Sequence, residues 1–190
     1  MDTRERFSPL TITLHWLVAL GILGLIAFGI YMVKTESWPL YHIHKSFGLL
    51  IFTLALLRAL WRWKNGFPQP LGRPSPFEHL AALWMHRLLL ACTLLMPLTG
   101  MLYSAASGNG FGIFSLEIFP ANPQHDASGA ALPLNAGLSG LGQNLHDTLG
   151  YLLLVLIILH AAAAVWHHFM HKDQTLNRML GRKQQTHRAG

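Results

Sequence analysis

The stretch HDTLGYLLLVLIILHAAAAVWHHF, residues 146–169, decides the fold. From Thr148 to His171 the sequence contains no Asp, Glu, Lys or Arg, and such a run is long enough for a membrane-spanning helix. His146 and His160 are 14 residues apart, so on this helix they share one face and differ by about 21 Å in depth. Because ionisable side chains are costly inside a membrane, two of them on one face indicate a functional role.

Three further apolar stretches predict a bundle of four membrane-spanning helices. The chain has 190 residues, of which 52% are hydrophobic and 12% are charged, whereas soluble domains contain about 25% charged residues. We expect an all-α membrane protein that forms a single domain over residues 1–190. The predicted spans are residues 14–33, 43–63, 79–102 and 145–169.

The distribution of basic residues predicts the orientation of this bundle. They gather before the first span, between the second and third spans, and in the tail 172–190, whereas the connection 103–144 contains no Lys or Arg. Because basic residues are enriched in cytoplasmic loops, we expect both termini in the cytoplasm and residues 103–144 on the opposite, periplasmic side. The net charge of +6 then reflects topology and lipid contact, and it does not indicate nucleic-acid binding.

Each histidine of the last span has a partner at its own predicted depth. His15 lies about one turn into the membrane near the start of the first span, level with His160, and His44 lies at the start of the second span, level with His146. Two imidazoles that face each other across a helical bundle suit the axial positions of a haem iron. We therefore predict two b-type haems, one held by His15 and His160 and the other by His44 and His146.

Small and basic residues accompany these histidines. Gly48 and Gly150 each follow a histidine by four residues, where a macrocycle has to approach the backbone, although small residues also favour ordinary helix packing. Arg58 follows His44 by fourteen residues, and it is the candidate partner for the propionates of the haem nearer the termini. Lys45 is the candidate for the other haem, although a lysine at a span end also reaches the interface.

Other polar residues are candidates for a quinone site or a proton path. His86 is predicted at a depth similar to that of His160, where it is an alternative haem ligand, a propionate partner or a proton donor. His167, His171 and Lys172 follow at the same end of the last span, where anchoring at the membrane interface is the alternative interpretation. No catalytic residue is identified beyond these candidates.

Four segments of the chain resemble the bacterial cytochrome b561 family. They are RFSPLTITLHW (6–16), HKSFG (44–48), LHDTLGY (145–151) and LHAAAAVWHHFMHKDQTLNRML (159–180). The resemblance implies a four-helix bundle in the bacterial inner membrane, two b haems, and electron exchange with ubiquinone. It implies the same four haem ligands that we predict from membrane depth and helix face, namely His15, His44, His146 and His160.

The sequence does not identify the electron donor. Some members of the family are superoxide oxidases, which implies superoxide as a donor and ubiquinone as the acceptor. The connection 103–144 carries Glu117 and Asp126 but no basic residue, so the sequence offers no positive funnel for an anion there. Lys34 and Lys45 are the nearest basic residues.

Two other functions compete with a self-contained, quinone-linked oxidoreductase. A cytochrome b subunit that anchors a soluble dehydrogenase or hydrogenase needs the same two haems and a soluble redox partner. A transporter for transition-metal ions uses histidine ligands without haem, but the scarcity of intramembrane carboxylates argues against it.

Overall fold

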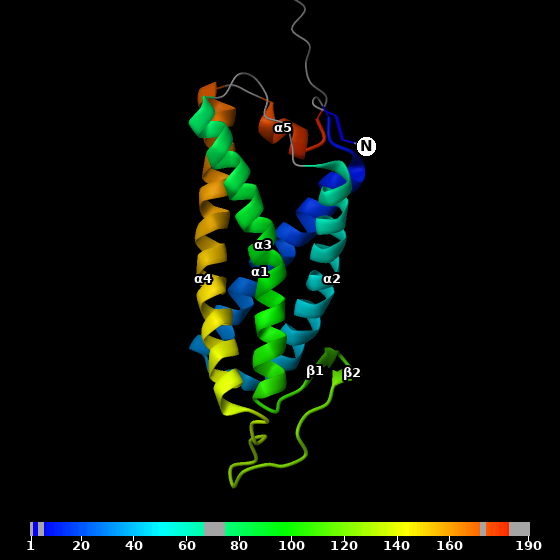
Figure 1. The fold of residues 1–190 in the computed structure, drawn as a ribbon, viewed down its shortest axis with the longest axis vertical. Helices are drawn as coiled ribbons and strands as arrows, with labels where there is room; N and C mark the ends of the chain where they lie inside the picture. The colour runs from blue at the N-terminus through cyan, green and yellow to red at the C-terminus, as the bar shows by residue number, and fades with distance from the viewer. Residues whose placement is uncertain (1, 4–5, 67–74, 172–173, 183–190) are drawn as a thin grey trace, which may run out of the picture.

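Four long helices form a bundle in the computed structural model, which describes residues 2–3, 6–66, 75–171 and 174–182 (Figure 1). All four are long and apolar enough to cross a membrane, so the predicted α-helical membrane bundle is confirmed. The four helices are α1 (Pro9–Lys34), α2 (Tyr41–Asn65), α3 (Pro76–Ala106) and α4 (Ala136–Trp166). The short helices are η1 (Trp38–Leu40), η2 (His167–His171) and α5 (Thr175–Met179).

Local capping groups set the first residues of the helices. The Ser8 hydroxyl accepts a hydrogen bond from the Thr11 amide, and a proline follows Ser8 where no amide donor is needed, so α1 begins at Pro9. The Asn135 side chain accepts from the Leu138 amide, so α4 begins well before the predicted start at residue 145. Hydropathy marks the apolar part of a helix, and both helices extend beyond that part.

The apolar core lies midway along the bundle. On α4 its residues fall between His146 and His160, so the two histidines lie on either side of the core along the helix axis. Many other large apolar side chains are exposed on the outer faces of the helices, as expected for surfaces that contact lipid. The core residues are Val18, Ile22, Ile26, Ala55, Leu89, Cys92, Leu153 and Leu156.

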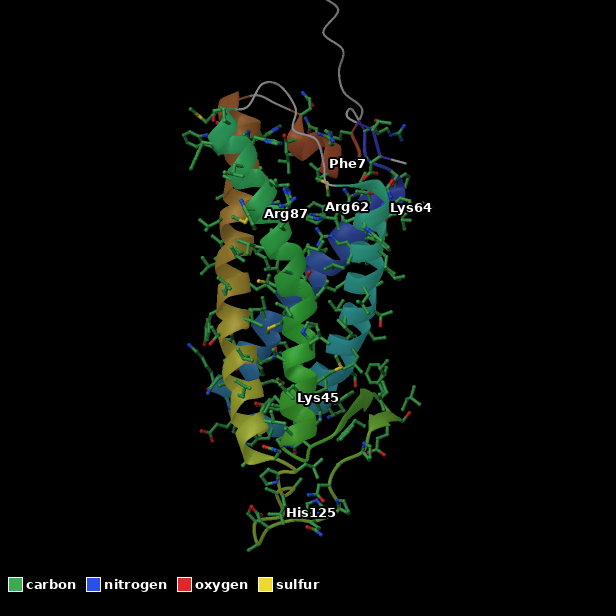
Figure 2. The ribbon with its side chains drawn as sticks, viewed as in Figure 1. Phe7, Lys45, Arg62, Lys64, Arg87 and His125 are labelled. Atoms are coloured by element: carbon green, nitrogen blue, oxygen red, sulfur yellow. The ribbon has the colours of Figure 1, made fainter. Side chains whose placement is uncertain are left out.

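The N-terminal segment and α5 lie at the same end of the bundle (Figure 1). The indole Nε1 of Trp16 donates a hydrogen bond of 2.9 Å to the carbonyl oxygen of Met179, which ties α5 to α1. The Arg178 guanidinium lies 4.1 Å from the ring centre of Phe7. Arg62, Lys64 and Arg87 lie toward this end, whereas Lys45 and His125 lie toward the other (Figure 2).

The connection between α3 and α4 contains a feature that the all-α prediction omits. Strands β1 (Phe111–Ile113) and β2 (Leu116–Phe119) pair antiparallel in a short hairpin. The hairpin lies beside the lower end of α2, and the rest of the connection extends beyond the bundle (Figure 1). Residues 103–106 and 136–144, predicted as parts of this connection, belong to α3 and α4.

Candidate functional site

Two pairs of histidines face each other inside the bundle. The ring centroids of His15 and His160 are 6.4 Å apart with an interplanar angle of 61°. Those of His44 and His146 are 6.3 Å apart with an angle of 84°. One histidine of each pair comes from α4. The rings that lie close together are those paired from the sequence by their depth in the membrane and by the helix face that they share.

The two ring separations fit one metal ion between the members of each pair. Metal–imidazole bonds of about 2.0 Å place the centroids of two rings on opposite sides of one ion about 6.2 Å apart. Both observed separations agree with this value, and the interplanar angles exclude face-to-face stacking of the rings. Two axial imidazoles are a donor set suited to a b-type haem.

The orientation of His146 is fixed by α3. Its Nδ1 lies 3.0 Å from the carbonyl oxygen of Met96 and 3.4 Å from the hydroxyl of Thr99. Because a carbonyl only accepts, Nδ1 carries a proton and donates it to Met96, which leaves Nε2 as the nitrogen with a free lone pair in the neutral ring. Such a partner typically sets the tautomer and angle of a metal-binding histidine.

Glycines make room for both rings of the second pair. A Cβ atom at Gly100 would lie 2.9 Å from Cε1 of His146, and a Cβ at Gly29 would lie 3.3 Å from Cε1 of His44. The Phe28 ring stacks on His44 at a centroid distance of 6.2 Å. Within the described part of the chain, the buried Nδ1 of His44 has no hydrogen-bond partner.

The two glycines that the sequence predicted to cradle a macrocycle have different surroundings. A Cβ at Gly48 would meet nothing within 4 Å, so open space lies one turn from His44. A Cβ at Gly150 would lie 3.2 Å from Cε of Met96, so a flexible side chain already fills that place.

The two predicted propionate partners lie at opposite ends of the bundle. Arg58 reaches the level of His15, where its Nη2 lies 3.4 Å from Nδ1 of that ring. Lys45 instead donates hydrogen bonds of 3.1 Å and 2.8 Å to the carbonyl oxygens of Asn109 and Gly110. Lys45 therefore holds the segment before β1 against α2.

His86 lies next to His160, as its predicted depth required. Its ring centroid is 5.3 Å from that of His160, and its Nδ1 donates a 2.7 Å hydrogen bond to the carbonyl oxygen of Ala82. Two rings that bind one ion from opposite sides need a larger centroid distance than this. The distance between the rings of His15 and His160 has the required value.

The remaining quinone or proton-path candidates lie farther along the chain. His167 and His171 are the first and last residues of η2, at the end of the bundle that carries α5. Lys172 lies outside the described residues.

Across residues 2–3, 6–66, 75–171 and 174–182, no group of three or more His, Cys, Asp or Glu side chains is arranged to hold a metal ion. The histidines form facing pairs instead.

The chain is similar to several known bacterial cytochromes. Residues 6–182 match the family model described as prokaryotic cytochrome b561. The chain is 33% identical to cytochrome b561 homolog 2 of Escherichia coli K12, with 95% of this chain and 94% of the relative aligned. It is 29% identical to the "Probable superoxide oxidase CybB" of Yersinia pestis, with 94% and 98% aligned. It is 28% identical to cytochrome b562 of Cereibacter sphaeroides, with 95% and 98% aligned.

The family match covers nearly the whole chain, including all four long helices and all four paired histidines. Proteins of this family are bacterial membrane cytochromes that bind b-type haem and transfer electrons, which suits a bundle with four candidate membrane spans. The chain therefore belongs to the prokaryotic cytochrome b561 family, as a multi-pass protein of the bacterial inner membrane.

Proposed function

We propose that this chain is a di-haem electron-transfer enzyme that oxidises a small one-electron donor and reduces ubiquinone. His15 and His160 would hold one b-type haem, and His44 and His146 would hold the other. The observation that carries the proposal is the near-identical separation of the two ring pairs, 6.4 Å and 6.3 Å. When bound, haem supplies reversible one-electron chemistry.

The protein's own groups support an asymmetric pair of sites. At the His44 and His146 site, the Met96 carbonyl accepts a hydrogen bond from Nδ1 of His146, which leaves the lone pair of the neutral ring on Nε2. His44 is held by the stacked Phe28 ring and by close contact with Gly29. These contacts restrict the rings before a cofactor binds, which lowers the cost of ordering them.

Arg58 would serve the site at the other end. A histidine that binds a metal through Nε2 keeps its proton on Nδ1, so His15 could not then accept a hydrogen bond from Arg58. The guanidinium would need another acceptor nearby, and a propionate carboxylate fits its planar set of donors. The contact of 3.4 Å between Arg58 and His15 is long enough to exchange readily.

The end that carries α5 is proposed to face the cytoplasm. Arg62, Lys64 and Arg87 lie toward this end (Figure 2), and short cytoplasmic segments carry an excess of basic residues. The donor would then approach from the hairpin end, and ubiquinone would react near His86, His167 and His171. With superoxide as donor, two superoxide ions, one ubiquinone and two protons yield two oxygen molecules and one ubiquinol.

The first test is the haem content and the reduced-minus-oxidised absorption spectrum of the purified full chain. We expect two b haems per chain, and one in each of the variants His146→Ala and His160→Ala, with a different spectral component lost in each. His42→Ala is the matched control, because His42 is exposed on the same helix as His44 and bonds to the Pro39 carbonyl. Haem-free wild-type protein, or loss of the same component in both variants, would reject the paired assignment.

The second test is ubiquinone reduction by the isolated, haem-loaded chain during steady generation of superoxide. We expect ubiquinol to form at one molecule for every two superoxide ions consumed. A chain with two haems that forms no ubiquinol would reject superoxide as the donor. If a small artificial reductant also gave no ubiquinol, the self-contained enzyme would be rejected, and an electron-transfer subunit that depends on a soluble partner would remain.

A further inference from the structure

The β1–β2 hairpin is held against the side of α2 by contacts at both of its ends. Near its base, the Lys45 ammonium donates to the carbonyl oxygens of Asn109 and Gly110. At its tip, the amide of Phe114 donates a 2.8 Å hydrogen bond to the hydroxyl of Ser46. Ser46 is almost fully buried, and its hydroxyl also donates to the carbonyl oxygen of His42. The hairpin is thus a fixed part of the bundle.

The tip of this hairpin lies alongside α2 rather than beyond its end. The Phe114 ring makes an edge-to-face contact with Phe47 at a centroid distance of 5.6 Å. Phe47 is six residues into α2, which begins at Tyr41, so it lies about 9 Å along the helix from that end. Trp38 and Tyr41 contact each other at the end itself, with ring centroids 5.6 Å apart, and aromatic side chains are typical of the membrane interface.

Three side chains of the hairpin are suited to lipid and poorly suited to water, whereas Glu117 alternates with Leu116 and Ile118 along β2 and so points to the opposite face. Phe114 is 57% exposed, Leu116 is 64% exposed and Ile118 is 52% exposed, and Phe47 on α2 is itself exposed. Together they continue the lipid-facing surface of α2 onto the hairpin. Phe114 also has a φ of 51°, a left-handed conformation that is unfavourable for a bulky residue. The fold accepts this conformation and points an aromatic ring outward.

The hydrogen bonding of the backbone at the hairpin tip is also consistent with a location in lipid. An unpaired amide is costly in lipid, and irregular backbone is tolerated there only when its polar groups are satisfied by the protein. The amide of Phe114, at the turn between the two strands, is satisfied by the Ser46 hydroxyl. A hairpin exposed only to water would gain little from a buried side-chain acceptor at this position.

We propose that the β1–β2 hairpin inserts into the lipid bilayer beside α2 and packs its apolar side chains among the acyl chains. The inserted side chains are Phe114, Leu116 and Ile118. The remainder of the connection, which includes His125, stays in water at the same end of the bundle (Figure 2). This proposal concerns the hairpin alone, and it holds whichever electron donor the chain uses.

Spin labels on the full chain in liposomes test this insertion. The one cysteine, Cys92, is replaced in a Cys92→Ser background, and labels are attached in the variants Leu116→Cys, Ile118→Cys and His125→Cys. Oxygen concentrates in lipid, and a charged nickel chelate stays in water. We expect the labels at 116 and 118 to collide severalfold more often with oxygen relative to nickel than the label at 125 does. All three labelled positions are exposed, so the labels displace no buried side chain, and the unlabelled Cys92→Ser chain is the control for the buried substitution that all three share.

Two outcomes would overturn the proposal. Equal access of nickel chelate to positions 116, 118 and 125 would place the hairpin in water. Dipolar broadening between labels at 116 or 118, lost on dilution with unlabelled chain, would show that a second copy of the protein covers the hairpin instead of lipid.

Discussion

The imidazole of His146 on α4 donates a hydrogen bond from Nδ1 to the carbonyl oxygen of Met96 on α3, across 3.0 Å. The same ring is adjacent to Gly100, one turn farther along α3, where a Cβ would lie 2.9 Å from Cε1 of His146. The hydrogen bond to Met96 and the space left by Gly100, both on α3, therefore fix the direction of this imidazole. The geometry of the His44 and His146 pair depends on α3, which contributes no histidine to it.

Replacing Gly100 should disturb this pair without damaging the bundle. In Gly100→Ala the new methyl group would press on Cε1 of His146 and force the ring to move. We expect a lower occupancy or an altered absorption band for one haem, measured in the reduced-minus-oxidised spectrum. The matched control is Gly24→Ala on α1, where a Cβ meets nothing within 4 Å. Because alanine favours helices by about 1 kcal/mol over glycine, the control should keep both haems and lose no stability.

Replacing His86 should leave both haems in place. Its ring lies 5.3 Å from that of His160, which is too close for ligation from the opposite side of one ion, whereas His15 lies at 6.4 Å. We expect His86→Ala to retain two low-spin haems in its absorption spectrum, and His15→Ala to lose one. Slower quinone reduction in His86→Ala with unchanged spectra would support a role in the quinone site. Loss of a haem in His86→Ala would instead make His86 the ligand opposite His160.

Much of the fold could be predicted from the sequence because membrane helices obey strong constraints. The absence of charge over long stretches identified four spans, and the helical repeat placed His146 and His160 on one face. Depth counted from each end then paired His15 with His160 and His44 with His146, and these rings lie close together. Each of these inferences uses only the rise and rotation of a regular helix.

Contacts between helices and within the loop could not be predicted in this way. Nothing local marks the Met96 carbonyl as the partner of His146, because that contact depends on how closely α3 approaches α4. The hairpin was missed because a two-strand pair of three and four residues leaves little periodic signal. The sequence offered two clues. Apolar residues alternate with small or polar residues along much of Phe111 to Phe119, and turn-forming residues flank this stretch. The role of Lys45 depends on that hairpin.

Arg58 offers a test of the proposed propionate contact. Removing the positive charge in Arg58→Gln should make the nearby haem harder to reduce, because a cation stabilises the form with one more electron. If the charge favours the reduced haem over the oxidised haem by about 1.4 kcal/mol, its loss lowers the midpoint potential by about 60 mV. A redox titration measures this shift. Arg58→Lys should recover part of it, and Arg87→Gln, at an exposed position on α3, should change neither potential appreciably. Equal shifts of both haems would argue against a local contact.

Asp2 and Arg62 form a salt bridge of 2.6 Å that closes the end of the bundle near the N-terminus. Burial alone would raise the pKa of the Asp2 carboxyl, but hydrogen bonds from Ser8, Thr11 and Arg62 outweigh it and lower the pKa below its ordinary value of 3.8. A carboxyl whose pKa is lower in the folded state stabilises the fold above its unfolded pKa. This contribution is lost as the pH falls through the lower, folded value.

The variant Asp2→Asn should therefore unfold at a lower temperature than the wild type at pH 7. The loss should be about 1–2 kcal/mol, because Arg62 is buried and would lose its charged partner. The difference should persist at pH 5 and disappear well below pH 3.8, where the wild-type carboxyl is also protonated. Thermal unfolding in detergent, followed by tryptophan fluorescence, measures it, with Glu117→Gln on the exposed hairpin as the control. A difference that stays constant down to pH 2 would mean that Asp2 acts through the shape of its side chain rather than through its charge.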